Sequence, residues 1–128
     1  MPINHEIPAQ VGTITPYFTV TDPDALIGFA TEVFGAKIVK ESRYDTGELQ
    51  HARLQIDDAL IMVNQATEAY AANVSQIHLY VGDVEACYRK ALDQGARSLM
   101  APNVRPHGEK MAGLKDPCSN IWWIAERG

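Results

Sequence analysis

The feature that most constrains the fold is an internal repeat, in which a strand-like segment followed by a helical one occurs twice. The stretch TPYFTVTD at residues 15–22 alternates like a half-buried strand, and QIHLYVGD at residues 76–83 does the same. A helical pattern follows each copy, and the two patterns end at Gly35-Ala36 and at Gly95-Ala96. Each copy is therefore predicted to form a strand–helix–strand unit.

Local chemistry supports a helix in each copy. Asp22 and Asp83 stand at the N-cap, where a side-chain oxygen accepts a hydrogen bond from a free backbone N–H group. Pro23 follows at the first helical position, and Gly35 and Gly95 are placed to end the helices in the left-handed conformation. The apolar faces are predicted to be Leu26, Phe29, Ala30 and Val33 in the first helix, and Val84, Cys87, Tyr88, Ala91 and Leu92 in the second.

Three further strands are predicted in each half, which makes two βαβββ modules within one α+β domain. The predicted strands are Lys37–Tyr44, Leu49–Ile56 and Ala59–Gln65 in the first half, and Arg97–Met100, Lys110–Lys115 and Ile121–Ala125 in the second. The modules cover about residues 13–65 and 76–126. The polar, alanine-rich segment Ala66–Ser75 is predicted to be the linker between them.

Composition excludes several classes of function. A net charge of -5, with basic residues scattered singly, argues against nucleic acid as a partner. No apolar run reaches the roughly 20 residues that a bilayer requires, so no membrane partner is expected. The segment Met1 to Val11 is polar and carries prolines where a signal peptide needs an apolar core, so the chain is expected to be cytoplasmic. Cys87 and Cys118 are interpreted as reduced thiols, although Cys118 could be a nucleophile if a cation lowered its pKa.

Short motifs at matching places in the two halves point to a family. They are Val20-Thr-Asp22, Val33-Phe-Gly-Ala36, His51-Ala52 and Ile61-Met62 in the first half, and Tyr80-Val-Gly-Asp83, Gln94-Gly-Ala96, Asp116-Pro117 and Asn120–Ile124 in the second. With the paired βαβββ modules, they resemble the vicinal oxygen chelate superfamily of glyoxalase I, extradiol dioxygenases and bleomycin-resistance proteins, most of all its PhnB-like branch. The resemblance runs from Thr13 to Glu126 and implies a curled mixed sheet around a cleft. It says little about function, because one fold hosts many chemistries.

The resemblance also implies where metal-using members place their ligands, which come from the first and last strands of both modules. Those positions hold Thr15, Met62, Gln76 and Trp123 in this chain. Divalent cations prefer imidazole nitrogen and carboxylate oxygen, whereas a thioether is soft and an indole N–H has no free lone pair. Gln76 alone cannot hold a metal against water, so neither a metal nor another cofactor is expected.

The alternation of the strands sorts the remaining candidates. Residues expected to face the helices and build the core are Phe18, Val20, Ile77, Leu79, Val81 and Trp122. Residues expected to line the cleft and contact a ligand are Thr15, Tyr17, Thr19, Met62, Gln76, His78, Tyr80 and Trp123, and His51 could share that face if the first module curls as in relatives. His78 is the candidate for catalysis, as a displaced metal ligand or a general base. It could equally be a polar cleft residue bonded to a neighbour or to water.

Two functional hypotheses follow. The first is a metal-free protein that binds and sequesters an aromatic or drug-like compound, as bleomycin-resistance relatives do, because the expected lining suits a flat organic ligand. The second is a lyase, isomerase or dioxygenase that uses His78 or a metal held by an unusual ligand set. A homodimer is expected, since small two-module members commonly pair. The segment Gly108-Glu109-Lys110 is interpreted only as a turn that enters a strand.

Overall fold

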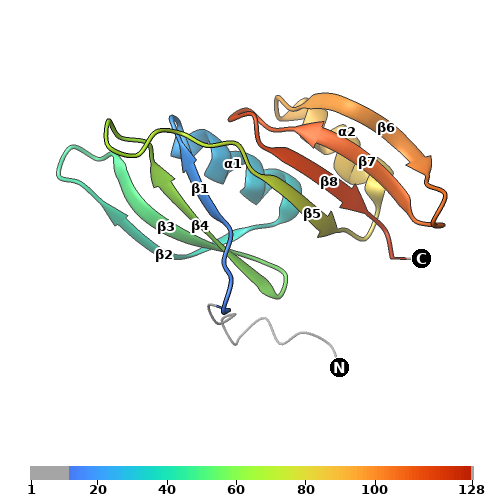
Figure 1. Cartoon of the computed structure of the whole chain (residues 1–128), viewed down its shortest axis with the longest axis horizontal. Helices are drawn as coiled ribbons and strands as arrows, with labels where there is room; N and C mark the ends of the chain where they lie inside the picture. The colour runs from blue at the N-terminus through green and yellow to red at the C-terminus, as the bar shows by residue number, and fades with distance from the viewer. Residues whose placement is uncertain (1–11, 128) are drawn as a thin grey trace.

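The computed structural model describes residues 12–127 and contains two four-stranded mixed sheets and two helices (Figure 1). The elements in chain order are β1 (Tyr17–Val20), α1 (Pro23–Phe34), β2 (Lys37–Arg43), β3 (Leu49–Ile56), β4 (Ala59–Gln65), β5 (Gln76–Tyr80), α2 (Val84–Asp93), β6 (Arg97–Val104), β7 (Lys110–Lys115) and β8 (Ile121–Ala125). The strand orders are β1-β4-β3-β2 and β5-β8-β7-β6, and β1/β4 and β5/β8 are the parallel pairs. The predicted α+β fold of two βαβββ modules is confirmed, and the sheets are not closed.

Both helices begin where the sequence predicts. The side chain of Asp22 accepts a hydrogen bond from the backbone N–H of Ala25, and Asp83 does the same for Ala86. The first helix ends at Gly35, whose φ of 69° is left-handed. The apolar face predicted for α2 is wrong at one position: the side chain of Leu92 is 37% exposed, because α2 is covered by its own sheet and by α1 on its other sides.

Strand boundaries differ from prediction mainly in two places, and β2 also ends one residue early, at Arg43 rather than Tyr44. The strand predicted to end at Met100 continues to Val104, because a register shift between Met100 and Asn103 lets the edge strand β6 pass Pro102 and pair again with β7. The first strand begins at Tyr17, so Thr15 precedes β1 rather than lying in it.

The segment between the modules is attached to the first sheet. The backbone N–H of Asn73 donates to the Thr19 carbonyl, and the Thr19 N–H donates to Oδ1 of Asn73. The linker therefore covers the outer edge of β1. The N-terminal segment on which the cytoplasmic expectation rests lies outside the described residues. No described helix is both long enough and apolar enough to cross a bilayer.

The buried core is continuous across the two modules, and Trp122 of β8 joins them. Its ring stacks on that of Phe18 from β1, with centroids 5.6 Å apart and an interplanar angle of 7°. It also contacts Phe34 at the end of α1, at 4.7 Å between centroids. Its indole nitrogen donates to Oδ2 of Asp116 over 2.8 Å. The other oxygen of Asp116 accepts the N–H groups of Cys118 and Asn120, so one buried carboxylate orders both the last turn and the central ring.

We predict that Trp122→Ala lowers the free energy of unfolding by about 3–5 kcal/mol, because a fully buried ring is deleted. Trp122→Phe keeps one aromatic ring but removes the rest of the indole with its N–H, so its cost combines a smaller cavity with about 1–3 kcal/mol for the oxygen of Asp116 left without that donor. Urea titration followed by circular dichroism measures both. Equal stability of Trp122→Ala and the natural protein would contradict this role.

Candidate functional site

The helices cover one face of each sheet and leave the opposite face open (Figure 1). In the first sheet, Tyr17 pairs with Met62 and Thr19 pairs with Asn64, and these side chains point away from the buried Phe18 and Val63. In the second sheet, the open face carries Gln76, His78, Tyr80 and Trp123, since Ile77 and Trp122 between them point to the core. Seven of the residues predicted to line the cleft thus lie on the open faces, three on the first sheet (Tyr17, Thr19 and Met62) and four on the second (Gln76, His78, Tyr80 and Trp123).

On the open face of the second sheet, the side chain of Trp123 is held by two contacts. Its indole nitrogen donates a hydrogen bond of 3.1 Å to Oε1 of Gln76. The ring lies against the backbone of Gly113 on β7, so closely that a Cβ at Gly113 would overlap it. Because Gly113 has no side chain, the Trp123 ring can lie flat against its backbone, and the Gln76 amide holds the edge of the ring. Together they fix the orientation of this half-buried aromatic surface.

The four positions that hold a metal in relatives do not fit a divalent cation here. The oxygen of Gln76 is engaged by the Trp123 N–H, and an indole N–H donates rather than coordinates. Thr15 and Met62 offer a hydroxyl and a thioether, which bind Mg²⁺, Mn²⁺ or Zn²⁺ poorly. Across residues 12–127, no group of three or more His, Cys, Asp or Glu side chains gathers in a way that could hold a metal ion.

A polar cluster adjoins His78 at the end of β5. The His78 ring meets that of Tyr80 edge-on, at 4.7 Å between centroids. The Tyr80 hydroxyl donates to Oε2 of Glu109 over 2.9 Å, and the guanidinium of Arg127 lies 4.2 Å from the Tyr80 ring centroid. The hydrogen bond to Glu109 raises the pKa of Tyr80, so the phenol stays protonated and is a poor base. From the sequence, Glu109 is expected only to form part of a turn. The pairing of β7 with β8 brings it next to Tyr80.

The open face of the first sheet carries positive charge. Lys40 on β2 and Arg53 on β3 are directly paired in register, and Ser42 is paired with His51 on the same face. A register shift between Ile38 and Lys40 aims Lys40 to this side. His51 also meets the Tyr17 ring edge-on, at 5.8 Å between centroids. Burial lowers the pKa of His51, and the charges of Arg53 and Lys40 lower it further.

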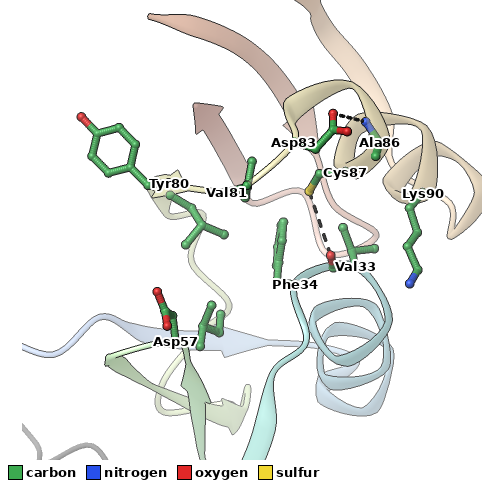
Figure 2. A pocket seen from close by; sticks show the side chains of 12 residues that line it. Val33, Phe34, Asp57, Tyr80, Val81, Asp83, Ala86, Cys87 and Lys90 are labelled. Atoms are coloured by element: carbon green, nitrogen blue, oxygen red, sulfur yellow. Dashed lines mark hydrogen bonds between the residues drawn. The ribbon is translucent and has the colours of Figure 1, made fainter. Parts of the chain in front are cut away.

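A separate pocket of about 350 Å³ lies between the modules on the helix side (Figure 2). Its lining combines apolar residues such as Val33 and Phe34 with Asp83 and Cys87, and it includes neither Met62, Gln76 nor Trp123. Asp83 is committed to capping α2, and burial raises the pKa of the Cys87 thiol to about 11. Neither of these two side chains is therefore an activated nucleophile or base.

Cys118 is no better suited to nucleophilic chemistry. Its thiol lies 3.4 Å from the carbonyl oxygen of Asp22, and burial, followed by the charge of Asp116, raises its pKa to about 11. Both cysteines are free thiols, as the sequence indicated. Neither is a thiolate near neutral pH.

Comparison with known proteins assigns the family. The model of the Glyoxalase/Bleomycin resistance protein/Dioxygenase superfamily matches residues 10–124. The chain belongs to this superfamily. An uncharacterized protein of Mycobacterium bovis is 26% identical to this chain over 124 residues. The match covers 88% of this chain and 82% of that protein. A similar protein of Mycobacterium tuberculosis is also 26% identical, with 88% of this chain and 73% of its own length covered.

Solved structures of superfamily members share the fold. TioX from Micromonospora sp. ML1 has a TM-score of 0.74 at 20% identity, covering 91% of this chain and 97% of its own. A PhnB protein from Bacillus cereus has a TM-score of 0.70 at 19% identity, covering 91% and 100%. The fosfomycin resistance protein FosX from Mesorhizobium loti has a TM-score of 0.67 at 16% identity, covering 91% and 92%. At these identities the likeness establishes the fold alone.

We predict that His51 titrates below its ordinary pKa, and that Lys40→Gln raises this pKa because it removes a cation that disfavours the imidazolium. Titration of the ring protons by NMR measures both values. Lys90→Gln, on α2 of the other module, is the matched control and should leave the pKa unchanged. A His51 pKa that does not respond to Lys40→Gln would show that burial and Arg53 cause the shift without a contribution from Lys40.

Proposed function

We propose that this superfamily member is a metal-free small-molecule-binding protein that sequesters an aromatic or drug-like compound. The observation that carries the proposal is Trp123, which replaces a metal ligand of relatives with an oriented aromatic surface on the open face. A flat ring can stack on that surface, and offset stacking contributes about 0.5–1.5 kcal/mol beyond the burial of area. One structural neighbour is named as a fosfomycin resistance protein, which is in keeping with a drug-like ligand.

The proposed lining combines aromatic and polar groups from both sheets. Tyr17 and Met62 come from the first sheet, and Gln76, His78, Tyr80 and Trp123 come from the second, with Thr15 just before β1. Rings supply area at low cost in conformational entropy, while the amide and hydroxyls fix orientation. The proposed partners are a small organic ligand and a second copy of the chain, rather than nucleic acid or a membrane.

We propose that the chain forms a homodimer that covers part of the open faces. Tyr17 and Tyr80 are 43% and 38% exposed on these faces. The edge strand β2 is exposed at all seven of its residues, from Lys37 to Arg43. Long uncovered strand edges favour association with another chain.

The alternative is an enzyme that acts through His78, alone or with an atypically held metal. What favours it is the alignment of His78, Tyr80 and Glu109, which could carry a proton between neighbouring groups. The protonated state of the Tyr80 phenol and the donor set around Gln76 both weigh against it. Metal analysis of protein purified without chelator separates the two functions: a stoichiometric content of Zn, Ni, Mn or Fe would favour the enzyme.

We predict that Trp123→Ala weakens the binding of planar aromatic compounds by about tenfold or more, because the stacking surface is lost. Gly113→Ala should weaken binding as well, since a Cβ there displaces the ring. Compounds that raise the melting temperature of the natural protein in an antibiotic and metabolite panel serve as ligands, and calorimetry measures the affinities. Both variants should fold, as Trp123 is only half-buried. Unchanged affinity in both would contradict the proposed site.

Sedimentation at tens of micromolar should give a mass near twice the 14.1 kDa of one chain. Introducing a charge on the exposed edge of β2, as in Val39→Glu, should weaken this association because an edge charge opposes strand pairing. Leu92→Glu on the exposed side of α2 is the control and should leave the mass unchanged. A monomer at this concentration would contradict the dimer.

A further inference from the structure

The first sheet contains a charge arrangement that folding does not explain. Lys40 and Arg53 stand directly opposite each other on β2 and β3, and like charges in this relation destabilise a sheet. Among the described residues, the ion pairs engage Arg43, His107 and Lys110 and leave Lys40 and Arg53 without a carboxylate. In a chain of net charge -5, what sets these two cations apart is that they face each other in register on one face.

Arg53 itself is incompletely bonded. Its Nε is buried and has no hydrogen-bond partner within residues 12–127. A buried donor on a charged group is costly when it is left unpaired, so native proteins normally satisfy it. The side of a guanidinium that presents Nε and one terminal nitrogen matches the two oxygens of a carboxylate. The unpartnered atom thus lies on the side of the guanidinium that such an anion would engage, and a rotation of the Arg53 side chain is needed to expose it to the anion.

A hollow for the rest of the ligand adjoins this group. It has a volume of about 320 Å³ and is lined by Tyr17, Thr19, Asn64 and Tyr70. Arg53 is paired with Met62, and Asn64 follows two residues later on the same face of β4, a spacing of about 7 Å. This spacing is comparable to the length of one planar ring, so a ligand ring could span it. Oδ1 of Asn64 is also buried without a partner, so it can accept a hydrogen bond from a ligand hydroxyl or N–H.

We propose that the open face of the first sheet binds an aromatic acid, whose carboxylate pairs with Arg53 and whose ring lies against Tyr17 in the hollow beside Asn64. Lys40 adds positive potential without a directed bond. The inference rests on the proposed function and adds to it a subsite on the first sheet that favours anionic aromatic compounds. Arg53 is then the residue that determines specificity for the acid.

Matched pairs of acid and amide test the inference, because they share a ring and differ in charge. We choose 2-naphthoate with 2-naphthamide and indole-3-acetate with indole-3-acetamide, measured by calorimetry at low salt. Each acid should bind the natural protein at least tenfold more tightly than its amide. Arg53→Gln should reduce that ratio to within about twofold, chiefly by weakening the binding of the acid. Arg97→Gln, on β6 of the other sheet, should preserve the ratio.

A second measurement uses the natural protein and does not depend on how the variant folds. The NMR resonance of the Arg53 Nε–H should shift on titration with 2-naphthoate and not with 2-naphthamide. If the amides bind as tightly as the acids, or if Arg53→Gln leaves the ratio unchanged, the inference is overturned and the proposed binding function stands. If neither member of any pair binds at millimolar concentration while Trp123→Ala still abolishes binding of other planar compounds, the acid class alone is overturned. If no planar compound binds at all, the proposed function falls with it.

Discussion

The structure depends on the ring of Trp122, which lies between elements that are far apart in the sequence. Phe18 and Phe34 belong to the first module, yet both contact this side chain of the last strand. The two modules are therefore joined through their helix-covered faces. Asp116 fixes the ring from the other side, and because it is buried at 4% exposure, its hydrogen bonds form in a setting where they are strong.

Because the modules meet through these faces, the side chains of the candidate site lie on the opposite faces of the sheets. If the helix-covered faces meet in the core, the opposite faces of both sheets remain open. The next residue in the chain, Trp123, points to the open face because side chains alternate along a strand. Two adjacent tryptophans thus have separate roles: one holds the modules together and the other presents a surface. The linker reinforces the arrangement, since Asn73 binds the edge of β1 and Ser75 binds Asn120.

Sequence reasoning predicted the features that local chemistry determines. The caps at Asp22 and Asp83 follow from side chains that bond within their own turn, and the repeat revealed the module order. Sequence-based prediction failed where the pairing between strands decides the length of a strand or the position of a side chain. The irregular register near Pro102 lengthened β6 beyond prediction. Glu109 reaches Tyr80 only because β7 and β8 bring a distant turn to the end of β5, and no pattern in the sequence marks that contact.

The same limit applies to Arg53 and Lys40, whose opposition is a property of register rather than of sequence. A strand that alternates between core and solvent explains why each side chain lies on the open face, but not why two cations meet there. Had stability alone shaped this face, one of the pair would be expected to be neutral or acidic, as Asp24 and Glu41 are around Arg43. Departures from local consistency concentrate at functional sites. The partial burial that lowers the pKa of His51 also reduces the solvent screening of the half-buried Arg53 beside it, so an anion there would interact more strongly than at the exposed Lys40.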